Sequence, residues 1–200
     1  MCAWRPDRNY LKRIPSSAAR VLAAAILLTA IDTVIAQDLC SDYQSRRNCV
    51  GKNRPVHNGI DFGGVAGTEV ISATYGTVVE RNFDECSGHG LTVRTDFRAT
   101  HEDKEGPVFV RYAHVEGFVR VVPGLKLKPG DPIGTTIPLR HTVCHGSREH
   151  VHYELRVLKN AKRHIDPHAY WADGPSKVTC YKEGMTVPPG KTVAPIRCAP

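Results

Sequence analysis

The sequence predicts an all-β protein, folded as an antiparallel β-sandwich or an open, barrel-like core with long loops. Short runs rich in branched and aromatic residues recur along the chain and are separated by glycine and proline. Beyond the first 36 residues, no segment gathers its apolar residues at the 3.6-residue spacing of a long helix. Residues 150–158 alternate apolar and polar side chains, which is typical of a half-buried strand.

The expected strands are justified by their valine, threonine and aromatic content and by the turn residues between them. In chain order they are Thr68–Ala73, Gly76–Arg81, Leu91–Thr95, Val108–His114, Gly117–Val122 and His150–Leu158. A turn at Tyr75-Gly76 separates the first two, and Lys128-Pro129-Gly130-Asp131 marks a later turn. The segment Gly174–Pro200 is rich in proline, glycine, lysine and threonine, and we expect it to extend over the surface as a disulfide-tied tail.

The strand at 150–158 places two histidines on one face. Successive side chains of a strand point to opposite faces, so His150 and His152 point the same way. Two neighbouring imidazoles suit a metal ion, which readily takes a neutral imidazole nitrogen. The alternative is a surface strand with two solvated histidines. Glu154 extends the same face, either as a solvated group or as one that orients an imidazole.

Residues 1–36 have the order of parts found in an export signal. Basic residues precede the apolar run Val21–Ala30, which is too short to span a bilayer as a helix. Val34-Ile35-Ala36 then supplies small or branched residues before a cleavage at Gln37. An uncleaved helix and a retained anchor are the alternatives. No second long apolar run follows, so we expect a periplasmic or secreted chain without stable membrane insertion after cleavage.

The cysteine count agrees with export. Cys2 lies in the signal segment, and six cysteines remain. An even number in an exported chain points to disulfides, although the count leaves many connectivities open. The connectivity that we favour pairs near neighbours at each end and the remaining two across the middle: Cys40–Cys49, Cys180–Cys198 and Cys86–Cys144. A thiolate zinc site is disfavoured because no C-x-x-C spacing occurs.

Charge pattern and export together favour a cell-wall polymer over nucleic acid as the partner. The chain has 27 Lys+Arg and 20 Asp+Glu, and the signal segment holds five and two of them, which leaves 22 and 18 and a net charge of +4. This mild excess suits anionic surfaces such as cell-wall polymers. No basic run with interleaved aromatic residues occurs. We expect one domain at 56–173, preceded by a lead-in at 37–55 and followed by the tail at 174–200.

Two further segments carry candidate residues. Asp61 follows His57 by four residues, and the nearby glycines make a helix unfavourable, so a turn leading into a strand is expected to bring the pair together. His114 follows Tyr112 at the end of an apolar strand, where a histidine commonly bonds to backbone instead. The remaining histidines are interpreted as surface or loop residues: His89, His101, His141, His145, His164 and His168.

Together these segments resemble the lysostaphin/LytM-type family of zinc endopeptidases, which cut peptidoglycan cross-bridges. Arg54–Phe62 resembles the family's R-x-x-H-x-G-x-D pattern, Tyr112–Val115 its Y-x-H-L and His150–Glu154 its H-L-H-F-E. The other segments that carry the resemblance are Gly67–Val79, Gly88–Gly90, Leu127–Gly134 and Ile165–Pro167.

The resemblance implies a catalytic site in a groove. His57, Asp61 and His152 would ligate Zn²⁺ and leave a fourth position for water. His114 and His150 would accept the proton of the zinc-activated water and stabilise the developing oxyanion. The chain is then expected to be a monomeric zinc metalloendopeptidase that acts on peptidoglycan peptides.

Departures from the family pattern leave the substrate open. Thr135–Glu149 is longer than the glycine-rich stretch of the family and carries Cys144. D-Ala–diaminopimelate bonds, polyglycine and other peptides all remain candidates. The alternative functions are a non-catalytic module of the same fold, which binds peptidoglycan or regulates a hydrolase, and an exported protein that stores or senses metal.

Overall fold

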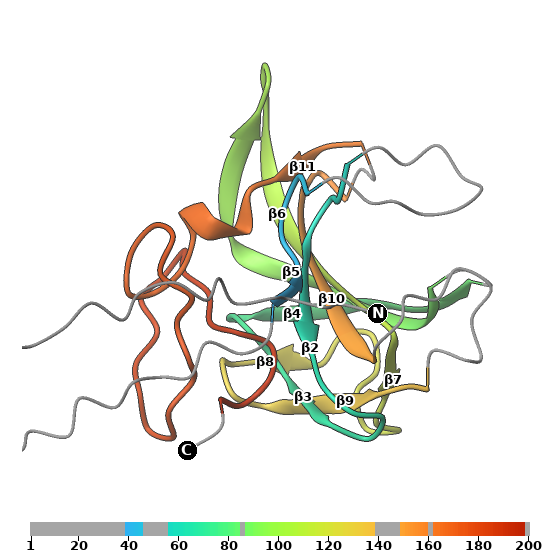
Figure 1. Ribbon diagram of the computed structural model, residues 1–200. Coiled ribbons are helices and arrows are strands. Elements are labelled where there is room, and N and C mark those ends of the chain that lie inside the picture. The colour runs from blue at the N-terminus through green and yellow to red at the C-terminus, as the bar shows by residue number, and fades with distance from the viewer. Residues whose placement is uncertain (1–38, 46–55, 85–86, 139–148, 160–161, 199–200) are drawn as a thin grey trace, which may run out of the picture. The chain divides into compact units, whose positions relative to one another are not determined.

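The computed structural model describes residues 39–45, 56–84, 87–138, 149–159 and 162–198 (Figure 1). In this part of the chain the structure is built from antiparallel strands, which confirms the predicted fold class. A short 3-10 helix, η2 (Pro167–Ala169), follows the last strand. The signal segment, His141, His145 and three of the cysteines assigned to disulfides (Cys49, Cys86 and Cys144) lie outside the described residues. No helix among the described residues is long and apolar enough to cross a membrane.

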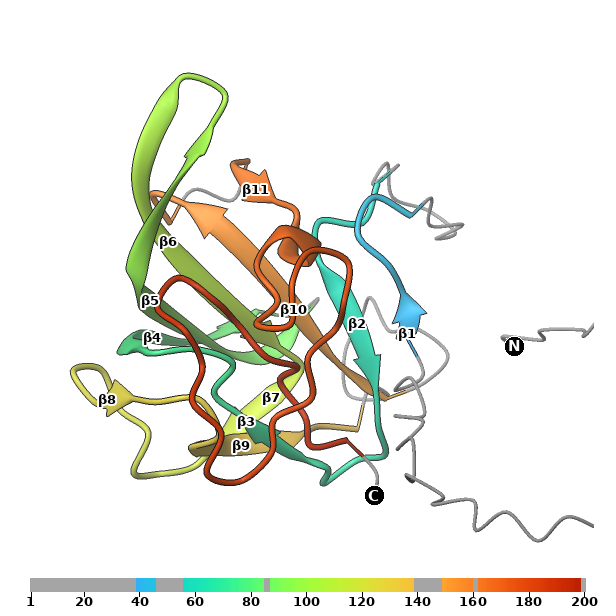
Figure 2. The same ribbon diagram turned by 90° about the vertical axis from the view of Figure 1, so that its left-hand side faces the viewer.

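An eight-stranded sheet forms the frame of the fold. Its strands, in spatial order, are β1 (Leu39–Ser41), β2 (Ile60–Gly63), β10 (His150–Val157), β6 (Lys104–Ala113), β5 (Gly88–His101), β4 (Gly76–Asp84) and β8 (Lys126–Leu127), with β11 (His164–Ile165) paired to β10. A second sheet contains β3 (Glu69–Ile71), β9 (Pro132–Thr136) and β7 (Val115–Gly117). Figure 2 shows this small sheet beneath the large one.

One face of β10 supplies the centre of the core. Its alternate side chains are fully buried: Val151, Tyr153, Leu155 and Val157. Val70 of β3 and Ile133 of β9 belong to the same buried cluster, so the small sheet packs on this face. The alternation predicted for 150–158 is therefore confirmed, and the polar face of β10 points away from the core.

Aromatic side chains tie the layers together. Trp171 is fully buried and stacks on Tyr153 with ring centroids 5.8 Å apart, while Phe62 meets Trp171 edge-on at 6.1 Å. The hydroxyl of Tyr112 on β6 accepts a hydrogen bond of 2.9 Å from the amide of Ala73, which follows β3. This bond joins the large sheet to the small one within the core.

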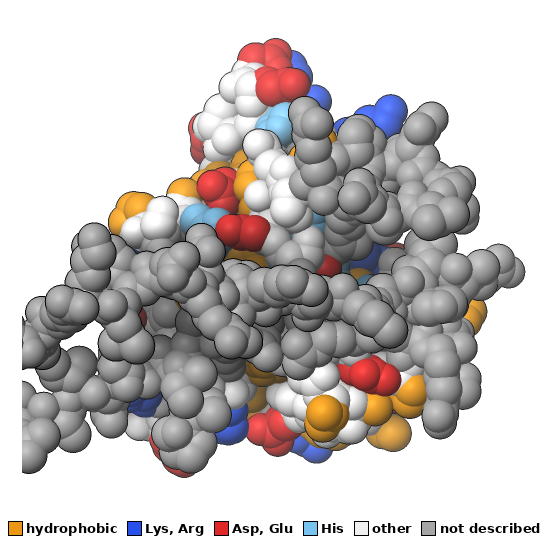
Figure 3. Space-filling model, viewed as in Figure 1, with side chains coloured by type: hydrophobic (Ala, Val, Ile, Leu, Met, Phe, Trp, Pro, Cys, Tyr) orange, Lys and Arg blue, Asp and Glu red, His pale blue; other side chains and the backbone are white. Residues whose placement is uncertain are grey.

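The hairpin of β5 and β6 is longer than the sequence predicted. The two strands remain paired out to His101 and Lys104, beyond the predicted ends at Thr95 and Val108. Charged side chains gather at the tip of this hairpin, at the top of Figure 3. The tip is the end of the hairpin that lies farthest from β7 and β9 (Figure 1).

The prediction of a strand at Gly117–Val122 is wrong. Strand β7 ends at Gly117, which pairs with Gly134 of β9. The amide of Phe118 still bonds to the Ile133 carbonyl, and then the amide of Val121 bonds back to the Phe118 carbonyl, so the chain turns. The partner strand does not continue beside this segment, and its valine content alone does not make a strand there.

The C-terminal segment does not extend over the surface as expected. Val187, Val193 and Ala194 are buried, and Ile196 forms a bridge with Val70 of β3. The tail therefore completes the core. The disulfide Cys180–Cys198 is confirmed, with a Cα–Cα distance of 5.7 Å.

We expect Ile196→Ala to lower the free energy of unfolding by about 2–5 kcal/mol, because it removes buried apolar volume beside β3, at the edge of the small sheet. Ile196 is 4% exposed. Urea unfolding measures the change. The matched control is Val119→Ala, at a side chain 90% exposed, where we expect a change within about 0.5 kcal/mol. Equal effects of the two substitutions would contradict the packing described for the tail.

Candidate metal centre

Strands β2 and β10 bring the candidate residues together. In their antiparallel register Asp61 lies directly opposite His152, and His150 lies opposite Gly63. Side chains of directly opposed residues share a face of the sheet, so the Asp61 carboxylate meets the His152 ring. His57 lies just before β2, and its ring reaches the same point from the end of the strand. The expected turn-then-strand arrangement of His57 and Asp61 is thus present.

Three side-chain atoms converge at this point. Asp61 Oδ1 lies 2.9 Å from His152 Nδ1 and 3.1 Å from His57 Nε2, and the two ring nitrogens are 3.0 Å apart. Asp61 and His57 are buried, and His152 is nearly so. These are the three residues to which the resemblance assigns metal ligation, and one ligand atom from each lies within 4.8 Å of the others.

The environment of His57 sets its tautomer. His57 Nδ1 lies 2.9 Å from the backbone carbonyl of Asp42, and a carbonyl can only accept a hydrogen bond. Nδ1 therefore carries the proton. In the neutral ring this leaves the lone pair on Nε2, which faces Asp61 and His152.

His152 is oriented in the same manner by Glu154. Nε2 of His152 lies 3.3 Å from Glu154 Oε2, so the ring donates from Nε2 and turns the Nδ1 lone pair toward Asp61. Glu154 is buried, and its carboxylate also accepts from Arg156 and, at 2.6 Å, pairs with His164. Burial favours the neutral acid, but these partners hold the pKa of Glu154 well below its ordinary value.

Two imidazole lone pairs and a carboxylate oxygen therefore point at one another. Such atoms repel unless a proton or a metal cation lies among them. Burial alone would raise the pKa of Asp61 and lower that of His152. When a proton on His152 Nδ1 takes this place, its hydrogen bond to Asp61 holds the pKa of Asp61 well below its ordinary value and raises that of His152. Two nitrogens and one oxygen are also a donor set that zinc uses, so the cluster fits a divalent cation.

The other two candidates, His114 and His150, adjoin this cluster. Their ring centroids are 4.7 Å apart with an edge-to-face tilt of 72°, and His150 Nε2 lies 3.5 Å from Asp61 Oδ1. His114 has a φ of 63°, in the left-handed region, where the chain bends between β6 and β7. Its burial, with the neighbouring His150 and His152, lowers its pKa to about 3, so the ring is neutral at neutral pH.

The sequence did not point to the groups that support these residues. Ser41 and Asp42 were expected in a lead-in loop, yet they contact His57. His164 was interpreted as a surface or loop residue, and instead its partly buried ring pairs with Glu154 on the neighbouring strand. The alternating pattern of β10 did leave open that Glu154 orients an imidazole, and the structure places it in contact with His152.

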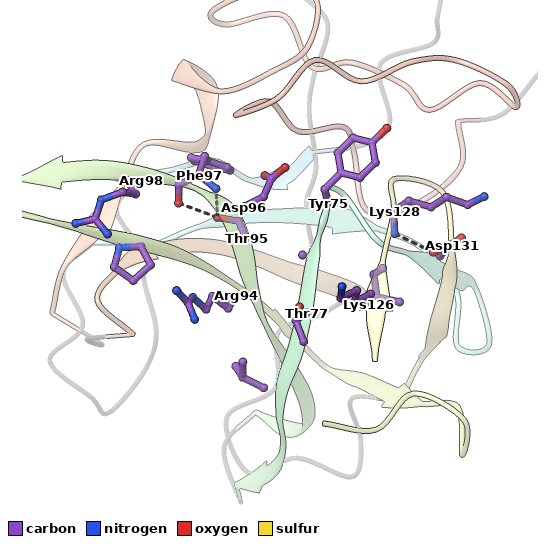
Figure 4. Close-up of a pocket in the computed structure, with 14 residues that line it drawn as sticks. Tyr75, Thr77, Arg94, Thr95, Asp96, Phe97, Arg98, Lys126, Lys128 and Asp131 are labelled. Atoms are coloured by element: carbon purple, nitrogen blue, oxygen red, sulfur yellow. Dashed lines mark hydrogen bonds between the residues drawn. The ribbon is translucent and has the colours of Figure 1, made fainter. Parts of the chain in front are cut away.

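A larger hollow lies elsewhere on the described residues. Its volume is about 920 Å³, and it is lined by the start of β4, the adjoining part of β5 and β8 (Figure 4). Arg94, Arg98, Lys126 and Lys128 give its wall a basic character, with Asp96 and Asp131 among them. None of the five candidate residues lines it. We place the chemistry at the histidine cluster, because the convergent donor atoms lie there and not in the hollow.

Comparisons with known proteins identify a family and similar folds. The model of peptidase family M23 matches residues 55–167, which include all five candidates. The catalytic domain of lysostaphin from Staphylococcus simulans is 22% identical over 64% of this chain and 86% of that chain, with a TM-score of 0.51. The structure of LytU is 20% identical over 65% and 81% of the two chains, with a TM-score of 0.53. None of the curated proteins that were compared matches the chain.

We expect Glu154→Ala to destabilise the fold by about 3–5 kcal/mol, because it leaves Arg156 and His164 without their partner. The pKa of Glu154 is lowered by folding, so its contribution is present above the ordinary value of 4.5 and is lost as the pH falls below it. Unfolding in urea at several pH values measures both effects.

The control for this substitution is Glu105→Ala. Glu105 pairs with Arg98 at 2.8 Å, but both side chains are exposed, so we expect a loss of about 0–1 kcal/mol. A loss of the same size for both variants would show that Glu154 is not the anchor of a buried network.

Proposed function

Because the chain belongs to peptidase family M23, which bears out the resemblance seen in its sequence, we propose that it is an exported zinc metalloendopeptidase that hydrolyses peptide cross-links of bacterial peptidoglycan. The observation that carries this proposal is the convergence of His57, Asp61 and His152, with His114 and His150 beside them. Export is supported by the Cys180–Cys198 disulfide, which is typical of oxidising compartments.

His57, Asp61 and His152 are the residues that would hold the zinc ion. Three protein ligands with one position left for water is the usual composition of a catalytic zinc site. Zinc, when bound, lowers the pKa of water toward ~7 and polarises a carbonyl group. The protein's part is to fix the two ring tautomers, through the Asp42 carbonyl and the Glu154 carboxylate.

His114 and His150 would divide the proton transfer and the stabilisation of charge. The low pKa of His114 makes it a weak base but leaves a neutral ring, which can donate a hydrogen bond to a developing oxyanion. We therefore assign the proton-accepting role to His150. The His150 ring lies against His114 and near Asp61, so the two histidines can reach one substrate carbonyl.

Removal of a ligand tests the metal centre. We expect the wild-type chain to bind about one zinc ion and to release soluble fragments from peptidoglycan, and His152→Ala to lose both properties. Metal analysis and fragment release measure them, with His101→Ala on the β5–β6 hairpin as control. Full cleavage by metal-free His152→Ala protein would refute the mechanism. A wild-type chain that binds peptidoglycan without cleaving it would instead favour the non-catalytic module.

Substitution of His114 or His150 separates catalysis from metal binding. We expect His114→Ala and His150→Ala to retain zinc, since neither supplies a ligand, and each to lower kcat by about 100- to 10,000-fold. Steady-state kinetics on a defined cross-linked peptide, with zinc analysis of the same samples, measures both quantities. Unchanged kcat in either variant would remove that histidine from the mechanism.

Mass analysis of the released fragments identifies the bond that is cut. We expect cleavage within the peptide cross-link and intact glycan strands. Fragments that differ in sugar-chain length would contradict the proposed peptidase activity.

A further inference from the structure

We propose that residues 39–45 form a clasp that positions His57 for metal binding, and that Asp42 and His168 are its positioning residues. The inference rests on the proposed metal site and deepens it, because it identifies groups that set the affinity of that site. The clasp and His168 both lie outside residues 55–167, the region that the family model matches. The proposal therefore rests on contacts made by this chain outside the matched region.

The backbone of the clasp forms hydrogen bonds with both the amide and the carbonyl of His57. Strand β1 pairs with β2, so that Ser41 lies opposite Asp61. Beyond β1, the amide of Gln44 donates to the His57 carbonyl at 2.8 Å, and the His57 amide donates to the Ser45 carbonyl at 3.0 Å. Gln44 has a φ of 57°, in the left-handed region, and this bend turns both groups toward His57.

The clasp also contacts the His57 ring. The Asp42 carbonyl accepts from Nδ1 at 2.9 Å, and the Ser41 hydroxyl lies 3.0 Å from the same nitrogen. Ser41 Oγ is itself 2.8 Å from Ser45 Oγ. These contacts fix the ring orientation and keep the proton on Nδ1, which leaves Nε2 toward Asp61 and His152.

His168 anchors the clasp to the core. The indole Nε1–H of Trp171 can only donate, so His168 Nδ1, 3.0 Å away, must accept. The neutral ring then carries its proton on Nε2, which donates to Asp42 Oδ1 at 2.7 Å. A hydrogen-bonded path thus runs from the fully buried Trp171 through His168 and Asp42 to His57.

The exposure of the Asp42–His168 hydrogen bond indicates how much its loss should change stability and zinc affinity. Asp42 is half exposed, so its bond to His168 contributes little to global stability. Its loss instead frees the clasp, and His57 can then rotate or shift its proton to Nε2. Groups that orient a ligating imidazole typically change metal affinity by 10- to 100-fold when removed, and we expect roughly tenfold here.

The test measures Zn²⁺ affinity in the full chain by competition with a chromophoric chelator. We expect Asp42→Ala and His168→Ala each to raise the dissociation constant roughly tenfold. Because both act on one path, the double variant should lose no more than either single variant. His168→Gln, whose amide can donate to Asp42, should recover part of the affinity. The matched control is Asp103→Ala, between the ends of β5 and β6 at the hairpin tip, which should leave the constant unchanged.

The outcomes separate the clasp from the proposed function. Wild-type zinc affinity in both single variants, or losses that add in the double variant, would overturn the clasp even if the wild-type chain cleaves peptidoglycan. Weaker zinc binding in the variants, with no cleavage by the wild type, would overturn the proposed function and support the clasp. If circular dichroism shows that His168→Ala does not fold, Ser41→Ala decides: weaker zinc binding supports the clasp, and unchanged binding overturns it.

Discussion

The antiparallel pairing of β2 with β10 is the constraint on which both the core and the site depend. On one face it sets Asp61 opposite His152, and on the other it sets Ile60 opposite Tyr153 within the core. A slip of one residue would turn the imidazoles inward and the apolar side chains outward. A slip would disrupt the apolar core and the histidine cluster at the same time. The packing that stabilises the sheet therefore also holds the candidate ligands in register.

The sequence carried enough information to predict the fold class and to single out five residues that the structure brings together, but not the groups that support them. Strict alternation in β10 indicates which side chains share a face, and that needs no knowledge of the partner strand. The support of His57 comes through a backbone carbonyl of Asp42, a group that every residue possesses. No pattern of residue types marks such a contact, and it becomes visible only when β1 is found beside β2.

The predictions of an extended surface tail and of a strand at Gly117–Val122 were wrong for a related reason. Val187, Val193 and Ile196 stand singly among proline, glycine and lysine, so they form neither helical nor strand periodicity. Their burial follows from the position of the small sheet. At 117–122 the local preference for a strand is real, but no neighbour is present to pair with it beyond Gly117. In both cases tertiary contacts outweigh local composition.

The His57 and His152 rings that meet in the cluster are 95 residues apart in the chain. No partial fold that lacks the β2–β10 pairing can present them together, so the site exists only once this pairing has formed. An ion bound there closes a long loop and shifts the folding equilibrium toward the native chain. Metal choice then depends on supply at the moment of pairing, because nitrogen and oxygen donors accept several divalent ions. The ions present in the compartment where the chain folds would thereby decide which one such a site holds.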